Sequence, residues 1–206
     1  MTALRYTLLT DGSSDRVLLP VIDWLLSQHT QSVFNGEWAD LRRLLNPPHR
    51  LQDRIQRAVE MYPCHLLFVH RDAEKAARHV RVDEIRAARA AEPPAVCVVP
   101  VRMQEAWLLF NEDAIREAAG KPTGREPLHL PGLQRTENEP NPKRLLRDAL
   151  LTASGLHGRR RRQFPVVERI YRLAVLIEDF SPLRALVAFT ALEAELRETL
   201  EENGWA

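Results

Sequence analysis

The sequence predicts an α/β protein whose mostly parallel sheet is flanked by helices and followed by an α-helical C-terminal extension. Short apolar runs alternate with segments of helical periodicity through the first half of the chain. The run at residues 95–101 is continuously apolar, which is typical of a strand buried on both faces of a parallel sheet. Because parallel strands are joined by crossovers, the alternation indicates right-handed strand–helix–strand units.

The first strand and the first helix are expected close to the N-terminus. Residues 4–10 are apolar and rich in β-forming side chains, and the run ends at Asp11-Gly12. Ser14 or Asp15 is suited to cap the helix that follows. The apolar side chains of that helix recur at helical spacing: Val17, Leu18, Val21, Ile22, Leu25 and Leu26.

The remaining elements follow from turn residues and from changes of periodicity. Residues 30–41 have no clear pattern, although 32–34 fit an edge strand. Pro63 and Pro93-Pro94 mark the ends of two helices. In chain order we expect a helix at about 50–61, a strand at 65–69, a helix at 73–91, a strand at 95–101, a helix starting near Met103, a long loop at 120–142, and helices at 143–152, 166–178 and 182–202. This order predicts an α/β domain over residues 1–120 and a loop with a helical extension packed on it over residues 121–206.

The composition is that of a folded, soluble protein. The 206 residues are 45% hydrophobic and 28% charged, and the formal net charge is +1. Contact with nucleic acid therefore has to come from a local patch rather than from the net charge. Cys64 and Cys97 lack metal-ligand spacing and fit buried free thiols in a reducing compartment. With no signal-peptide pattern and no apolar run long enough to span a membrane, we expect a cytoplasmic protein without a membrane partner.

Acidic side chains follow two of the expected strands. Asp11 and Asp15 come after the first, and Asp72 and Glu74 come after the strand at 65–69. In open parallel sheets, ligands bind beyond the carboxyl ends of the strands. Carboxylates gathered there repel one another unless a cation neutralises them, and carboxylate oxygens are the ligands that Mg²⁺ prefers. The alternative is that Asp15 is only a helix cap, and that Asp72 and Glu74 are only first-turn acids.

These motifs resemble those of the Toprim domain, which occurs in topoisomerases, DnaG-type primases and OLD-type nucleases. Asp11-Gly12-x-x-Asp15 resembles its first motif, and the cluster around Asp72 resembles its D-x-D motif. The stretch from Val99 to Leu109, with Glu105-Ala106-Trp107 at its centre, and the later Pro142-Lys143 are similar to a Toprim-like bacterial family, the DUF4276 family. The resemblance covers most of residues 4–145 and implies a Toprim, Rossmann-like sheet.

The resemblance also implies roles for individual residues. Asp11 would be a metal ligand or general base, and Asp15 the second acid that OLD-type nucleases use. His70 and Asp72 stand at the two acidic positions of the D-x-D motif, so a histidine replaces the first acid. His70 is able to ligate a transition metal and suits Mn²⁺ or Zn²⁺ better than Mg²⁺. Alternatively, His70 marks a site that no longer cuts.

Several further residues complete the expected site. Glu105 is a candidate fifth acid that follows the third strand, the alternative being an exposed helix acid, whereas Trp107 is expected in the core. Lys143 is placed to contact a scissile phosphate, or else is a solvated lysine at a helix start. The run of four arginines, Arg159, Arg160, Arg161 and Arg162, forms either a nucleic-acid contact or a solvated loop.

The expected function is metal-dependent hydrolysis of phosphodiester bonds in DNA or RNA, with Mg²⁺ or Mn²⁺ as cofactor. The candidate catalytic residues are Asp11, Asp72 and Lys143, and the candidate metal ligands are Asp11, Asp15, His70, Asp72, Glu74 and Glu105. The resemblance further implies a phage-defence effector that works with an ABC-type ATPase partner. The alternatives are an eroded Toprim-like module for binding or assembly, and a phosphatase or phosphotransferase for small substrates. The chain contains no P-loop, GxGxxG, CxxC or serine-centred nucleophile motif.

Overall fold

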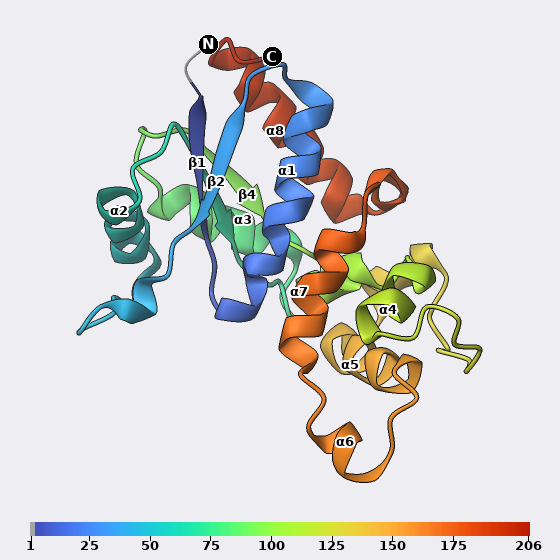
Figure 1. The fold of residues 1–206 in the computed structure, drawn as a ribbon. Coiled ribbons are helices and arrows are strands. Elements are labelled where there is room, and N and C mark those ends of the chain that lie inside the picture. Colours follow the sequence, from blue (N-terminus) through green and yellow to red (C-terminus); the bar gives the residue numbers. More distant parts are fainter. Residues whose placement is uncertain (1–2) are drawn as a thin grey trace.

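The computed structural model describes residues 3–206 and contains one parallel sheet covered by helices on both faces (Figure 1). The strands are β1 (Leu4–Leu9), β2 (Phe34–Trp38), β3 (Leu66–His70) and β4 (Ala95–Val98), in the order β2-β1-β3-β4. The strand order reverses between β1 and β3, and in such sheets the binding crevice lies at the carboxyl ends of those two strands. The predicted fold class, a parallel α/β sheet with a helical C-terminal part, is confirmed.

Helices connect and extend the sheet. The α-helices are α1 (Leu18–His29), α2 (Leu51–Met61), α3 (Arg78–Ala88), α4 (Glu112–Ala119), α5 (Pro142–Ala153), α6 (Gly158–Arg162), α7 (Val166–Leu176) and α8 (Val187–Glu202). Shorter 3-10 helices are η1 (Ser13–Val17), η2 (Leu41–Arg43), η3 (Gln104–Leu108), η4 (Leu133–Asn138) and η5 (Ser181–Ala185). Asn111 and Asn141 cap α4 and α5 with their side-chain oxygens, which fixes where these two helices begin.

The two faces of the sheet bury different sets of side chains. Tyr6, Leu8 and Phe68 face α1, α8 and the helical extension, whereas Leu9 and Val69 face α2 and α3. This alternation follows from the two-residue period of a strand. Figure 1 shows α2 on one side of the sheet and α1 with α8 on the other. Since both faces are covered, β3 and β4 are buried along their whole length, whereas the three central residues of the edge strand β2 are exposed.

The helical extension packs against the carboxyl end of the sheet. Helix α7 contacts η1, and α5 contacts η3, so both lie beside the loops that follow β1 and β4. A single hydrophobic cluster contains side chains of the sheet, such as Phe68, and of the extension, such as Leu146 and Leu173. Trp107 belongs to this cluster and is buried, as expected from the sequence.

Three sequence predictions on this edge of the sheet are wrong in detail. The strand expected over 95–101 ends at Val98. The helix expected over 73–91 begins only at Arg78, because the backbone before it is hydrogen-bonded to the segment after β4: the amide of Ala73 donates to Pro100 and that of Glu74 donates to Arg102. Glu74 has a positive φ of 53°, so Asp72 and Glu74 lie in a loop and not in a first helical turn. The helix expected near Met103 is the 3-10 helix η3, whose five residues are all buried.

Three further expectations concern a membrane span, the edge strand and the arginine run. None of the helices formed by residues 3–206 is long and apolar enough to cross a membrane. The edge strand expected at 32–34 overlaps the observed edge strand β2, Phe34–Trp38, only at Phe34. The arginine run forms the short exposed helix α6.

Candidate active site

Three of the candidate residues meet where β1 and β3 end. The Nδ1 atom of His70 lies 3.5 Å from Oδ2 of Asp15, and its Nε2 atom lies 3.2 Å from Oδ1 of Asp72. Gln104 and Glu105, the first two residues of η3, complete the group. The side-chain Nε2 of Gln104 donates to Asp15 Oδ1 at 2.8 Å, its backbone amide donates to Asp72 Oδ1 at 3.2 Å, and Glu105 lies within the influence of both carboxylates. These five residues, Asp15, His70, Asp72, Gln104 and Glu105, are called the site cluster below.

The carboxylate of Asp15 is held by its own loop and by η3. The Gly12 amide donates to Oδ2 at 2.8 Å, and the Ser14 hydroxyl donates to Oδ1 at 2.9 Å. Burial alone would raise the pKa of Asp15, but the His70 contact and the donors from Gly12 and Ser14 outweigh it and lower the pKa. Asp15 is therefore both the third residue of η1, whose side chain accepts from the amide of the N-cap residue Gly12, and an ionised member of the site cluster.

His70 supplies positive charge between two acids. Its side chain is fully buried, which opposes the charged form, but its contacts with the carboxylates of Asp15 and Asp72, and their charges, raise its pKa to about 9. The ring is thus an imidazolium at neutral pH. Its Nδ1 contact with Asp15 is an ion pair without hydrogen-bond geometry, so this nitrogen has no hydrogen-bond partner among the described residues.

Glu105 is buried rather than exposed, with 2% of its surface accessible. Burial raises its pKa to about 7, the Lys143 charge opposes this, and the charges of Asp72 and Asp15 add to it. Lys143 Nζ lies 3.8 Å from Oε1 of Glu105. Within residues 3–206, Glu105 Oε2 and Gln104 Oε1 are buried acceptors without a donor. Two orphaned acceptors in one place are costly, which is typical of a site built to receive a ligand.

Glu105 and Ser14 open onto a cavity of about 800 Å³ between α5 and α7, called the α5–α7 cavity below. Helix α5 lines it with Lys143, Arg144 and Arg147, and the chain entering α7 lines it with apolar side chains. The apolar lining residues are Phe164, Pro165, Val166, Val167 and Ile170, and Asn141, Asp148 and Glu168 complete it. Figure 1 shows α7 beside α5, below the end of the sheet. The structure thus brings Lys143 beside Glu105, a pairing that the sequence analysis did not predict.

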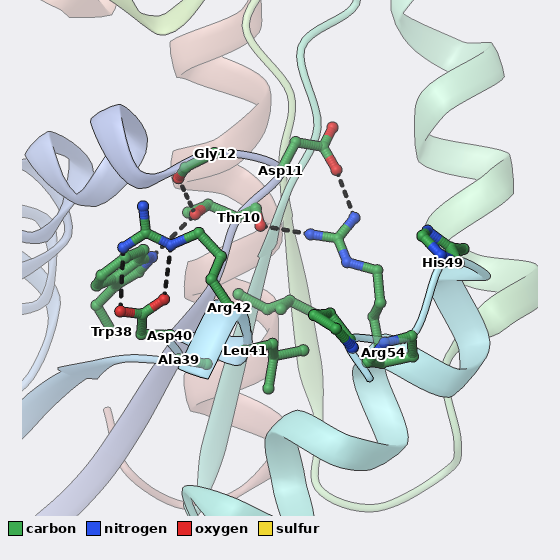
Figure 2. Close-up of a pocket in the computed structure, with 13 residues that line it drawn as sticks. Thr10, Asp11, Gly12, Trp38, Ala39, Asp40, Leu41, Arg42, His49 and Arg54 are labelled. Atoms are coloured by element: carbon green, nitrogen blue, oxygen red, sulfur yellow. Dashed lines mark hydrogen bonds and ion pairs between the residues drawn. The ribbon is translucent and has the colours of Figure 1, made fainter. Parts of the chain in front are cut away.

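Asp11 points away from this group. Its Oδ1 accepts from Arg54 at 2.7 Å and its Oδ2 accepts from Arg71 at 3.0 Å. Figure 2 shows Asp11 turned toward Arg54 beside a pocket of about 260 Å³ that is formed where β1 and β2 end. In the described part of the chain, Asp11 takes no part in the contacts that join Asp15, His70 and Asp72.

The other candidates lie outside the site cluster. Glu74 is exposed on the loop after β3. Arg161 is tied to α5 through a hydrogen bond from Nη1 to the Leu151 carbonyl at 2.8 Å, while Arg159, Arg160 and Arg162 are exposed. Sequence reasoning missed Gln104, although it directly precedes Glu105. It also missed Arg54 and Arg71, whose ion pairs with Asp11 form because α2 and the end of β3 both lie beside the loop that follows β1.

The site cluster has oxygen donors for a metal ion but not a preformed cage. Among residues 3–206, no three His, Cys, Asp or Glu side chains are arranged to hold a metal. The imidazolium of His70 stands between Asp15 and Asp72, where a cation shared by these carboxylates would sit. The orphaned oxygens of Gln104 and Glu105 remain available to a hard cation.

Comparison of the chain with protein-family models, with curated proteins and with solved structures found no match. The functional argument therefore starts from the site cluster and the α5–α7 cavity. Together they combine buried acids, a titratable group near neutral pH and a cationic wall, and such a combination is typical of active sites that act on anionic substrates.

Proposed function

We propose that this chain is a metal-dependent hydrolase of phosphodiester bonds in nucleic acid. The observation that carries the proposal is the opening of a buried acidic cluster, through Glu105, into a cavity walled by Lys143, Arg144 and Arg147. Lysine and arginine bind phosphate oxygens, and acids beside such a wall are suited to hold a cation or to move a proton. The proposal keeps the target open to DNA and RNA.

Each residue of the site has its own part in the proposed reaction. Lys143, which is 58% exposed at its side chain, binds and orients the phosphate next to Glu105. Asp15, Asp72 and Glu105 would hold Mg²⁺ or Mn²⁺, which supplies charge stabilisation and lowers the pKa of bound water. Glu105 also has a pKa of about 7, so it is able to accept and return a proton near neutral pH. Asp11 is already paired with Arg54 and Arg71, so the proposal gives it no direct part in holding the metal ion.

The wider assignment is also a proposal. The exposed arginines of α6 would contact the nucleic-acid backbone outside the cavity. The likeness of the Asp11–Asp15 and Asp72 motifs to Toprim and OLD-type nucleases supports a role as a phage-defence effector. That likeness also supports an ABC-type ATPase as the partner.

A second candidate is a binding module that does not cut. The observation in its favour is that His70 already neutralises Asp15 and Asp72, while no metal-ready group of three ligands is formed within residues 3–206. Such a module would use the same cavity for the same phosphates. The two candidates differ only in whether a metal ion displaces the proton of His70.

A cleavage assay separates them. Purified wild type, Asp72→Asn and the control Asp83→Asn, an exposed acid of α3, are incubated with DNA and RNA in Mg²⁺, Mn²⁺ or EDTA. We expect metal-dependent cleavage by wild type and by Asp83→Asn, and a loss of about 100-fold or more in Asp72→Asn. If wild type and Asp72→Asn are equally inert on every nucleic acid, the hydrolase proposal fails. Hydrolysis of a small phosphate ester without nucleic-acid cleavage would point to a phosphatase.

A further inference from the structure

The two long walls of the α5–α7 cavity differ in chemistry. The α5 wall is polar and carries Lys143, Arg144 and Arg147 beside Asp148. The opposite wall is mostly apolar and is formed by Phe164, Val166, Val167 and Ile170, with Glu168 also lining it. Val167 is 67% exposed and contributes one of the few large apolar surfaces open to solvent. A cavity with one cationic and one apolar wall fits a ligand that carries phosphate on one side and a flat apolar surface on the other.

The charges on the α5 wall are unequally committed. Arg144 pairs with Asp148 at 3.7 Å, and Lys143 pairs with Glu105 at 3.8 Å. Arg147 lines the cavity with its side chain exposed, and it has no ion pair within residues 3–206. Arg147 therefore gives up no ion pair within residues 3–206 when a phosphate binds, and Lys143 is the cation of this wall that stands beside the site cluster.

The apolar wall favours a single strand over a duplex as the ligand of the cavity. A duplex presents its backbone to a cationic surface and keeps its bases stacked inside, so an apolar wall opposite the cations would stay unused. Unpaired bases, in contrast, stack on aromatic and apolar side chains, while their phosphates run along a basic groove. The cavity volume of about 800 Å³ lies in the range, about 300 to 1,000 Å³, of pockets that enclose small organic ligands.

We infer that the α5–α7 cavity binds an unpaired nucleotide of a single-stranded nucleic acid, with its base against Phe164 and Val167 and its phosphate between Lys143 and Arg147. The inference rests on the proposed function for the choice of a nucleic acid as ligand. It deepens that function by assigning the substrate class, because the bond to be cut would then belong to an unpaired segment that ends at Glu105.

The aromatic platform is held in place before any ligand arrives. The guanidinium of Arg169 lies 5.7 Å from the centre of the Phe164 ring, and its Nη1 donates to the Ala118 carbonyl at 3.2 Å. Part of Phe164 packs on the main hydrophobic cluster, and the rest lines the cavity. A fixed ring loses little conformational entropy when a base stacks on it, which favours binding.

Binding is measured in EDTA, so that it is independent of cleavage. Fluorescence anisotropy compares labelled oligothymidylate and oligouridylate with a blunt hairpin duplex of equal length, for wild type and for Phe164→Ala, Val167→Ser and Arg147→Ala. The matched control is Val175→Ser, because Val175 is a 55% exposed valine of the same helix that does not line the cavity. The two oligonucleotides separate a DNA ligand from an RNA ligand.

We expect wild type to bind at least one single strand about tenfold or more tightly than the duplex. Phe164→Ala should weaken single-strand binding by about 5- to 150-fold, the range for loss of one stacked base. Val167→Ser should weaken it by about threefold or more and leave the fold intact, since the side chain is exposed and the two residues have similar helix propensity. Val175→Ser should bind as wild type does.

Two results would overturn the inference. One is a duplex that binds as tightly as both single strands, and the other is unchanged single-strand affinity in both Phe164→Ala and Val167→Ser. Failure of the proposed function has a different signature. Single strands would then bind in the cavity, with the expected losses in the variants, but would remain uncut when Mg²⁺ or Mn²⁺ is added. Cleavage of duplex alone would refute the assignment of a single-stranded substrate but would agree with the proposed function.

Discussion

Replacing His70 by asparagine should remove a specific part of the pH dependence of stability. The ring is fully buried between Asp15 and Asp72, and these acids raise its pKa to about 9 in the folded chain. In the unfolded chain a histidine titrates near pH 6.5. Because the folded pKa is the higher one, folding takes up a proton between these two values. The stabilisation is complete below pH 6.5 and is lost as pH rises through 9.

The size of the effect follows from the two pKa values. Each pKa unit corresponds to about 1.4 kcal/mol, so a rise from 6.5 to about 9 gives on the order of 3 kcal/mol in the free energy of unfolding. The lowered pKa of Asp15 results from the same ion pair, so it contributes no separate stabilisation. Asparagine also leaves two acids without their cation, and a broken buried pair typically costs about 3 to 5 kcal/mol.

Urea unfolding followed by circular dichroism, in EDTA and at steps between pH 6.5 and 9, measures this dependence. Wild type should lose about 3 kcal/mol over that interval, whereas His70→Asn should start lower and lose almost none. His79→Asn, an exposed histidine of α3, should behave as wild type does. Equal slopes in wild type and His70→Asn would show that His70 is not charged in the folded chain, and the charge assignment of the site cluster would be refuted.

Two further variants test other parts of the reasoning. Glu105→Gln should raise the free energy of unfolding at pH 8 by about 1 to 3 kcal/mol. Burial raises the Glu105 pKa to about 7, so at pH 8 the side chain is ionised and its burial lowers stability. An unchanged or lower stability in urea would contradict this. Gly36→Ala should lower the free energy of unfolding by about 3 kcal/mol or more, because the added Cβ would lie 2.2 Å from the Tyr6 ring. A melting temperature equal to that of wild type would show that β2 shifts without cost.

The strands were predictable because their apolar runs are short and are bounded by turn residues. Residues 4–10 and 65–69 were placed within one residue of β1 and β3. Burial of Trp107 also followed from its residue type and its place beside the third strand. These features depend on local pattern, and local pattern is what a single sequence displays.

The site was only partly predictable because its contacts join distant segments. Asp11 and Asp15 were expected to act together, yet Arg54 of α2 draws Asp11 away through an ion pair across 43 positions of the chain. The cavity wall of α5 and its apolar counterpart on α7 arise from packing of the helical extension, which no local pattern specifies. Gly36 is required by Tyr6, thirty positions earlier, for the same reason.

The charge of His70 distinguishes the two candidate functions, the metal-dependent hydrolase and the binding module. Burial opposes the charge of Asp15, and the His70 proton offsets this while also contacting Asp72. A divalent cation placed among the same oxygens would repel that proton, so the cation and the proton compete for one position. A neutral imidazole is itself a ligand that Mn²⁺ accepts more readily than Mg²⁺ does. Metal-dependent cleavage should therefore be stronger with Mn²⁺ than with Mg²⁺ and should rise with pH toward 9. Cleavage that is equal with both metals and falls over this range would mean that the metal is held away from His70.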